Sequence, residues 1–247
     1  MRIAVISDIH GNMDALESVL ESIRKERCEK IFVLGDIAMA GPQPEDTIDW
    51  FMQNAENYNI TMIQGNTDLM IANYSDELYK TLAEKAPVMA EALKDDCATL
   101  GQAHKDFLRK LPAKESLEID NVKILLVHGS PRRNNEDILP DTPMSEVRAM
   151  LHGVEEDVIL CGHTHIPCGF QTPEKKTVVN VGSVGRPFTQ EPKACYLKLT
   201  ITDGKCVFEH KFVDYNNERA ALKLRKRVFI GVNKLANTLI DPQLRHF

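Results

Sequence analysis

The 247-residue sequence contains no apolar run long enough to cross a membrane, since a spanning helix needs about 20 such residues. Near the N-terminus only Ile3 to Ile6 are consecutively apolar, whereas the hydrophobic region of a secretory signal has roughly 7–15 residues. The six cysteines show neither Cys-x-x-Cys nor zinc-finger spacing. We therefore expect no membrane contact, no signal peptide, reduced thiols and a cytoplasmic location.

The sequence also lacks an excess of positive charge, since 30 lysines and arginines stand against 36 aspartates and glutamates, a net charge of -6. This balance argues against a nucleic-acid polymer as partner. A small anionic substrate stays compatible with it, because bound metal ions would reverse the field locally. With 43% apolar residues, the chain can bury one large core, and we expect a single domain over residues 1–247. A homo-oligomer stays open.

The first 63 residues predict a β-α-β-α-β order, and hence parallel strands with right-handed crossovers. Apolar residues at helical spacing from Leu16 to Ile23 define the first helix, which Asn12 or Asp14 can cap. Pro44 suits the first turn of the second helix. The expected strands cover residues 2–7, 30–34 and 60–63.

Between residues 70 and 111 apolar residues recur at helical spacing, which predicts two or three inserted helices broken or kinked at Pro87. The insertion follows Asp68 directly and returns before the strand that ends at His128. We therefore expect it to cap the substrate, with a side bundle remote from the site as the alternative. Further strands are expected at 122–127, 158–161, 177–181, 194–201 and 206–213, followed by a helical, basic extension over 216–247.

Five short polar motifs share one context, because each directly follows an apolar strand. In open α/β sheets ligands bind beyond the carboxyl ends of the strands, so this placement gathers the motifs in one crevice. Any one of them alone is more often a turn or a coincidence, but the full set in this order indicates a site. The motifs are Asp8-Ile9-His10, Gly35-Asp36, Gly65-Asn66-Thr67-Asp68, His128-Gly129 and Gly162-His163-Thr164-His165.

The residue types in these motifs suit metal ions. Residues two apart, such as Asp8 and His10, point to the same side of an extended chain. Carboxylate and imidazole ligands favour Mn, Fe, Zn, Ni or Co over Ca, and we expect two divalent ions, Mn²⁺ first, with Mg as a further alternative. Seven ligands exceed the need of one structural zinc but serve a pair that shares one carboxylate. The candidate ligands are Asp8, His10, Asp36, Asn66, His128, His163 and His165.

The order of these motifs resembles the calcineurin-like metallophosphoesterase family over residues 1–201. The segments His128-Gly129-Ser130-Pro131 and Asn180-Val181-Gly182-Ser183 look like its small prokaryotic phosphodiesterase branch. The resemblance implies an α/β fold with a four-layer α/β/β/α sandwich, and catalytic roles for Asp36, Asn66 and His128. It implies one metal held by Asp8, His10, Asp36 and His165, and another held by Asp36, Asn66, His128 and His163, with Asp36 bridging.

The sequence departs from the family pattern at one position. The family's Gly-Asn-His-Asp motif supplies a histidine that protonates the leaving group or contacts the phosphate, whereas Thr67 stands here and Asp68 is retained. The small prokaryotic branch commonly departs in the same way, so an active enzyme is still expected. The change does remove the obvious general acid, a role typically worth about 10²–10⁴-fold in rate.

Other residues carry separate hypotheses. Arg132 and Arg133 follow the His128 loop and would act as substrate-binding residues, because guanidinium groups match phosphate oxygens. Exposed loop arginines are also commonly just solvated, and Arg186 is a similar case. His104 lies in the inserted helices as a candidate replacement acid, with an exposed helix residue as the simpler alternative.

The expected function is hydrolysis of a phosphodiester or phosphoanhydride bond in a small, nucleotide-type phosphorylated substrate by a metal-bridging hydroxide. Hydrolysis of phosphomonoesters or phosphoproteins is the alternative within the enzyme class. A non-catalytic scaffold of the same fold is the alternative from another class. Such a scaffold is expected to lose ligands, whereas all seven positions hold competent residues.

Overall fold

Two facing β-sheets form the centre of the protein in the computed structural model, which describes residues 1–242. The first sheet has the order β10-β9-β1-β2-β3 and the second β4-β5-β6-β8-β7. The first contains β1 (Arg2–Ile6), β2 (Lys30–Val33), β3 (Ile60–Met62), β9 (Ala194–Thr202) and β10 (Lys205–Val213). The second contains β4 (Lys114–Ile119), β5 (Val122–Val127), β6 (Val158–Cys161), β7 (Cys168–Gln171) and β8 (Thr177–Asn180).

Each sheet contains a run of parallel strands. β1, β2 and β3 pair in parallel in the first sheet, as do β5, β6 and β8 in the second. Parallel strands end at one edge, so the loops that follow them lie next to one another. All eight strands expected from the sequence are present, with ends within one residue of the expected ones. The sheet pairing therefore places the five polar motifs at neighbouring strand ends.

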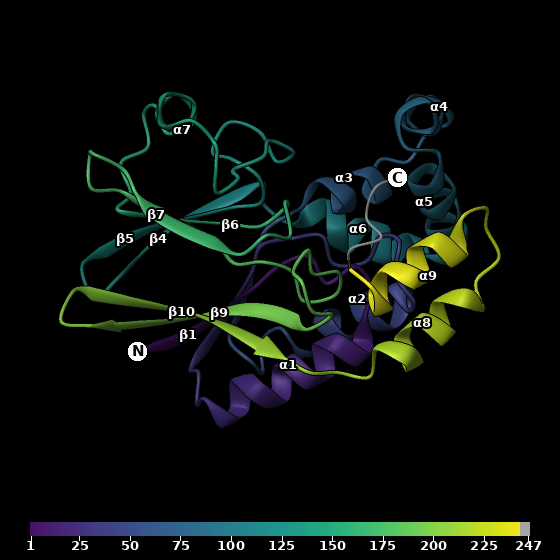
Figure 1. The fold of residues 1–247 in the computed structure, drawn as a ribbon, viewed down its shortest axis with the longest axis horizontal. Helices are drawn as coiled ribbons and strands as arrows, with labels where there is room; N and C mark the ends of the chain where they lie inside the picture. The colour runs from purple at the N-terminus through teal and green to yellow at the C-terminus, as the bar shows by residue number, and fades with distance from the viewer. Residues whose placement is uncertain (243–247) are drawn as a thin grey trace.

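The core lies between the two sheets and on the outer face of each. Ile3, Phe32 and Leu126 are among the apolar side chains buried between the sheets. Outside the first sheet, the apolar stripe of α1 (Met13–Lys25) packs into a second cluster, and Asn12 caps this helix by accepting from the Ala15 N–H. Outside the second sheet lies the short helix α7 (Met144–Met150). The four-layer α/β/β/α arrangement is thereby confirmed (Figure 1).

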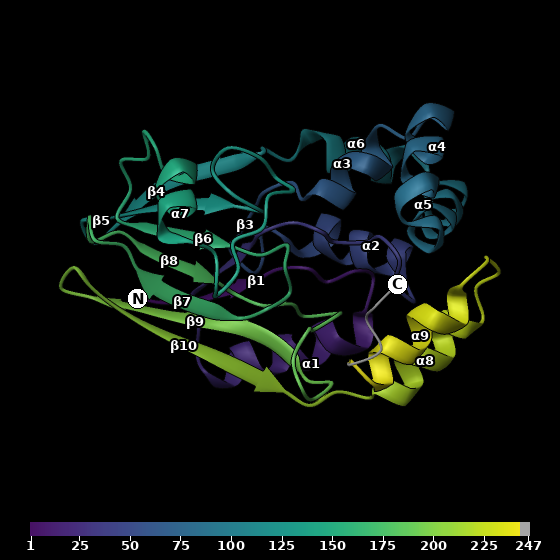
Figure 2. The ribbon, with the colours of Figure 1, turned by 45° about the horizontal axis from the view of Figure 1, so that its top comes forward.

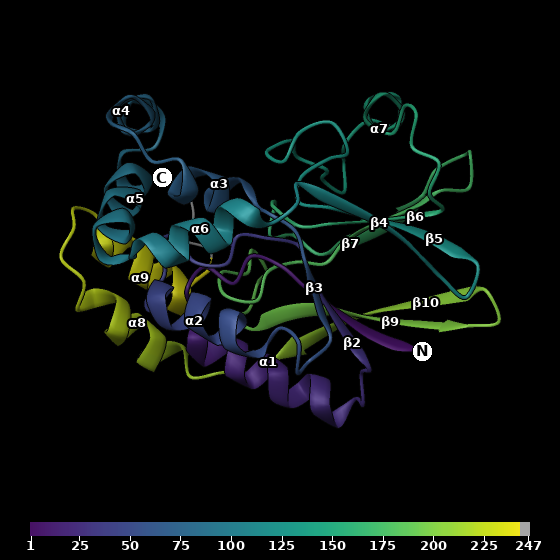
Figure 3. The ribbon, with the colours of Figure 1, turned by 180° about the vertical axis from the view of Figure 1, so that it is seen from behind.

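The helices that follow β2 and β3 gather at one end of the sandwich (Figures 1 and 3). Four helices span residues 66–110, where two or three were expected over 70–111. Pro87 breaks the helical run as predicted, because it opens a new helix at a position where its missing N–H costs nothing. The helices are α2 (Pro44–Asn54), α3 (Asn66–Ala72), α4 (Asp76–Lys85), α5 (Pro87–Thr99) and α6 (Gln102–Lys110).

The C-terminal extension is helical, as predicted, in the part that the structure describes; residues 243–247 lie outside it. It forms the hairpin of α8 (Asn217–Arg225) and α9 (Val232–Ile240), which lies at the same end of the sandwich as α4 and α5 (Figure 2). Its basic residues are not simply solvated, because Arg219 and Lys223 form ion pairs with the buried Asp14. Up to residue 242, the helices are too short or too polar to cross a bilayer.

Candidate metal centre

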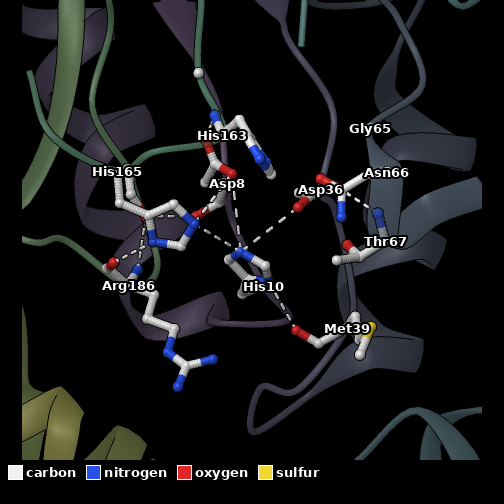
Figure 4. A network of polar contacts seen from close by, with 12 residues as sticks. Asp8, His10, Asp36, Met39, Gly65, Asn66, Thr67, His163, His165 and Arg186 are labelled. Atoms are coloured by element: carbon white, nitrogen blue, oxygen red, sulfur yellow. Dashed lines mark hydrogen bonds and ion pairs between the residues drawn. The ribbon is translucent and has the colours of Figure 1, made fainter. Parts of the chain in front are cut away.

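The loops after five strands bring the candidate ligands together. Asp8 and His10 follow β1, Asp36 follows β2, and Asn66 opens α3 after β3. The remaining candidates come from the second sheet, with His128 after β5 and with His163 and His165 after β6. Figure 4 shows Asp8, His10, Asp36 and His165 converging on one centre. The strand-end placement expected from the sequence therefore holds for all seven residues.

Asp8, His10 and His165 form the first group of potential ligands, and all three are buried. The Nε2 atoms of His10 and His165 lie 3.2 Å apart, and the Oδ1 atom of Asp8 lies 3.2 Å from His165 Nε2. His10 Nε2 lies 3.8 Å from the same carboxylate oxygen. Two imidazoles and a carboxylate directed at one point fit a divalent transition-metal ion.

A second group consists of Asp8, Asp36 and His128. His128 Nε2 lies 3.3 Å from Asp36 Oδ2, 3.9 Å from Asp8 Oδ1 and 3.0 Å from the side-chain oxygen of Asn66. Asp36 Oδ2 also lies 3.8 Å from His10 Nε2, so it reaches toward the first group as well. Both carboxylates thus lie between the two groups, which is the geometry that a shared ligand requires.

Backbone carbonyl groups orient three of the histidines. The Nδ1–H groups of His10, His128 and His165 donate to the carbonyl oxygens of Met39, Leu34 and Arg186 at 2.8, 2.6 and 2.6 Å. Because a carbonyl oxygen can only accept, each Nδ1 carries a proton and each Nε2 faces the centre, where it can bind a metal ion once it is unprotonated. Within residues 1–242 the buried Asp8 Oδ1 has no hydrogen-bond donor. This set of outward donors and inward acceptors fits metal ions.

The electrostatics of the centre favour bound cations. Burial alone would raise the pKa of Asp8, but His165 and His128 lower it to about 2. Burial and the neighbouring His165 lower the pKa of His10 to about 4. Burial would likewise lower the pKa of His128, but Asp36 and Asp8 raise it to about 10. The carboxylates are thus ionised and favour the protonated form of His128. A metal ion that binds to His128 would displace this proton.

The backbone at the centre is strained. Five of the seven candidate ligands have a positive φ, although none is glycine: Asp8 (55°), His10 (47°), Asp36 (54°), His163 (67°) and His165 (59°). Left-handed backbone is costly for residues with a Cβ and persists where the surroundings enforce it, commonly at functional sites. Gly65 allows the close approach of two loops, because a Cβ there would lie 2.1 Å from Asp36 Oδ1.

His163 differs from the other candidate ligands in that its ring also contacts a carboxylate outside the centre. Its ring lies 5.3 Å from that of His128, but its Nε2 lies 3.3 Å from Asp137 Oδ1 in the exposed loop after β5. Its backbone N–H donates to Asp8 Oδ2 at 3.0 Å. Asp137 was not among the expected site residues, since it does not lie directly after a strand and matches no motif.

Asp68 joins the motif loops that follow β2 and β3. Its carboxylate accepts from the backbone N–H groups of Asp36, Ile37 and Gly65 at 2.8–2.9 Å. Burial and the Asp36 charge raise its pKa to about 7, against the effect of these donors. The Thr67 N–H donates to Asp36 Oδ1 at 2.9 Å. Asp68 therefore holds the Asp36 loop against the start of α3. Backbone N–H groups keep its carboxylate in place without the histidine that the family motif has at position 67.

The two arginines expected to bind phosphate contact an acidic neighbour. Arg132 and Arg133 both donate to the buried carboxylate of Glu136, at 2.6 Å from their Nη2 atoms. Their side chains are 46% and 67% exposed. A phosphate would have to compete with Glu136 for these guanidinium groups, so their role as substrate-binding residues stays a prediction.

His104 occupies a structural position, and we expect His104→Ala to leave kcat within about twofold. Its Nδ1 accepts from the Gly101 N–H at the start of α6, and its Nε2 lies 2.9 Å from Asp49 Oδ1. Loss of a helix cap typically costs about 0.5–2 kcal/mol of unfolding free energy. Thermal unfolding and steady-state assays of the same preparation separate the two effects. A large loss of kcat without loss of stability would make His104 a catalytic acid.

Comparisons with known proteins agree with this geometry. Residues 1–204 of this chain match the calcineurin-like phosphoesterase superfamily domain. A hypothetical protein of Pyrococcus horikoshii OT3 has a similar structure, with a TM-score of 0.85 and 27% identity over 97% of this chain and 98% of that chain. A metallophosphoesterase from Sphaerobacter thermophilus gives a TM-score of 0.73 with 24% identity over 92% and 94% of the two chains.

A sequence relative extends the comparison to a further organism. An uncharacterized protein of Methanocaldococcus jannaschii is 27% identical over 262 aligned positions, which cover 93% of this chain and 98% of the relative. The family match includes the positions of all seven candidate ligands. This chain therefore belongs to the calcineurin-like phosphoesterase superfamily.

Proposed function

We propose that this chain is a dinuclear-metal phosphoesterase that hydrolyses phosphodiester or phosphoanhydride bonds of a small, nucleotide-type substrate. The observation that carries the proposal is the pair of overlapping ligand groups that share Asp8. Two bound divalent ions, Mn²⁺ first among the candidates, would supply an activated water and neutralise charge on the phosphate. The mixed carboxylate and imidazole ligands support such ions over Ca²⁺.

The protein's own residues would position the reacting groups. Asp36 reaches both ligand groups and is itself fixed by the Thr67 N–H. Asn66 turns its side-chain oxygen toward His128 at 3.0 Å, so its NH₂ group is directed elsewhere and can donate to a phosphate oxygen. Because a backbone N–H holds Asp36 and the His128 side chain holds Asn66, little reorganisation is needed when substrate binds.

A non-catalytic scaffold of the same fold would have no reason to keep this arrangement. Five ligand positions carry strained backbone, and three histidines carry dedicated carbonyl partners. Such strain is retained where the surroundings enforce it for function. The geometry therefore supports catalysis over a purely structural role.

The test is metal reconstitution followed by a substrate panel. Metal-depleted protein is loaded in parallel with Mn²⁺, Fe²⁺, Zn²⁺, Ni²⁺, Co²⁺ or Mg²⁺, and metal content is measured per chain. Each sample is assayed with an aryl phosphodiester, an aryl monoester, an alkyl monoester and a dinucleoside polyphosphate. We expect two metals per chain and the fastest turnover with the disubstituted substrates.

The other outcomes are distinct. Two bound metals without hydrolysis of any substrate would favour the scaffold. Faster turnover of monoesters than of the matching diester would favour a phosphomonoesterase. A chain that binds no divalent metal would refute the proposal altogether.

A further inference from the structure

One peptide unit connects the metal centre to a buried carboxylate in the inserted helices. The carbonyl oxygen of Met39 accepts from His10 Nδ1 at 2.8 Å. The N–H of the same peptide belongs to Ala40 and donates to Asp96 Oδ2 at 2.8 Å. Asp96 lies in α5 and is fully buried. A carboxylate, a peptide and an imidazole therefore stand in one hydrogen-bonded line that ends at His10 Nε2.

An arginine from the C-terminal hairpin completes this line. Arg227, which follows α8, places Nη1 2.7 Å from Asp96 Oδ1 and donates to the Gly41 carbonyl at 2.7 Å. The side chain of Arg227 is 11% exposed. Burial raises the pKa of Asp96 to about 6, and the guanidinium opposes that rise. Arg227 thus supplies the positive charge that a buried carboxylate needs in order to stay ionised.

We propose that Asp96 is a positioning residue for the metal ligand His10, acting through the Met39–Ala40 peptide, with Arg227 as its counter-ion. The inference rests on the metal centre of the proposed function. It gives the inserted helices and the C-terminal hairpin a shared role, since each contributes one member of the line. Neither residue touches the centre itself.

Carboxylates hydrogen-bonded to metal-binding histidines fix the ring and make its ligating nitrogen more basic. Here one peptide unit stands between the two groups. A negative charge at the Ala40 N–H polarises the peptide, and its carbonyl oxygen becomes a stronger acceptor for the His10 Nδ1–H. The same bond holds Ala40 at φ 65°, a conformation that is costly for a residue with a Cβ.

The arrangement distinguishes His10 from the other histidine of its ligand group. His165 donates to the carbonyl of Arg186, and the next residue is Pro187, which has no N–H to pass on the effect of a carboxylate. The loop of residues 39–41 also packs directly on His10, because a Cβ on Gly41 would lie 1.5 Å from the His10 carbonyl oxygen. The position of this loop therefore sets the position of His10.

The test measures Mn²⁺ binding to metal-depleted protein by calorimetry, with paramagnetic resonance to follow the spin-coupled pair. Asp96→Asn keeps the size of the side chain and one acceptor but removes its charge. Loss of an outer partner of a metal-binding histidine typically weakens metal affinity by about 10–100-fold. With a peptide in between, we expect about tenfold at one of the two sites, and no change at the other.

Variants of the arginine provide an independent measurement if Asp96→Asn fails to fold. We expect Arg227→Met to weaken the same site several-fold and Arg227→Lys to restore most of the affinity. Asp95→Asn is a matched control, because Asp95 binds the same arginine but makes no bond to the loop peptide. Arg219→Ala is a second control, since it removes another ion pair of the C-terminal hairpin.

Three outcomes would overturn the inference. The first is wild-type affinity in both Asp96→Asn and Arg227→Met. The second is an equal loss in the two controls, which would indicate a general effect of stability. In both cases the proposed function stands, because the wild-type protein still binds two metals. The third, a wild-type protein that binds no divalent metal ion of the reconstitution panel, would refute the proposed function as well.

Discussion

Asp36→Asn should lower kcat/KM by more than about 100-fold while the protein stays folded. Asn keeps the volume and an oxygen that can accept from the Thr67 N–H, which now donates to Asp36 at 2.9 Å. It loses the charge of a carboxylate that lies 3.3 Å from His128 and 3.8 Å from His10. Loss of an outer partner alone costs about 10–100-fold, so loss of a ligand near both groups should cost more.

Steady-state kinetics, metal content and thermal unfolding of the same preparation check this expectation. Asp49→Asn is a suitable control, because Asp49 is a partly exposed carboxylate that pairs with His104 away from the centre. Near-normal turnover of Asp36→Asn with two bound metals would remove Asp36 from the mechanism. Asp36→Ala is a harsher change, since it also leaves the buried Thr67 N–H without its acceptor.

The comparison with Asp8→Asn indicates which carboxylate is shared. The family resemblance assigns the bridge to Asp36, whereas Asp8 Oδ1 takes part in both ligand groups. If Asp36 alone bridges, Asp36→Asn should lose both metals and Asp8→Asn only one. Metal content per chain therefore distinguishes the two carboxylates even where both variants are inactive.

Local sequence patterns were sufficient to predict the central strands and the residues at their ends. β1 illustrates the reason, since Ile3 to Ile6 are all buried and the polar residues Ser7 and Asp8 follow directly. The edge strands β4 and β7 were missed because their residues alternate between exposed and half-buried positions, with little apolar contrast. α7 was missed as well, being a single short helix of seven residues.

Contacts between distant residues could not be predicted in this way. Asp96 lies 56 positions from Ala40 and Arg227 is 132 positions from Asp95, and no motif marks either contact. The pairing of Arg132 with Glu136 is close in sequence, but it depends on how the loop after β5 folds. The sequence therefore supports the ligand set, while the groups that orient those ligands emerge only from the fold.

The leaving group should control the rate strongly in the wild-type protein. Thr67 occupies the place where the family has a histidine, and a hydroxyl is too weak an acid for that role. The neighbouring Asp68 is no substitute, because both its oxygens accept backbone N–H groups. His104 is bound to Asp49 and to the start of α6. An alkoxide would thus have to depart without a proton from any of these groups.

Leaving groups that are stable as anions need no proton. Aryl oxides meet this condition, as does the phosphate released from a polyphosphate. The relevant pKa of this phosphate is about 6–7, by analogy with the second ionisation of a phosphate ester. We therefore expect log(kcat/KM) to fall steeply as the pKa of the leaving group rises along a series of diesters. Alkyl monoesters should be the poorest substrates, and dinucleoside polyphosphates should be among the best.

Two substitutions at one position test the cause of this dependence. Thr67→His should flatten the slope, with a gain of up to about 10²-fold for the poorest leaving groups, the lower end of the range for general acid catalysis. Thr67→Val is the matched control, because it keeps the shape of a side chain that is 6% exposed and removes a hydroxyl without a hydrogen-bond partner within residues 1–242. We expect its slope to equal that of the wild type. A flat wild-type dependence would mean that another acid, or the metal ions themselves, stabilises the leaving group. A Thr67→Val variant with a steeper slope would instead show that the hydroxyl assists departure by hydrogen bonding.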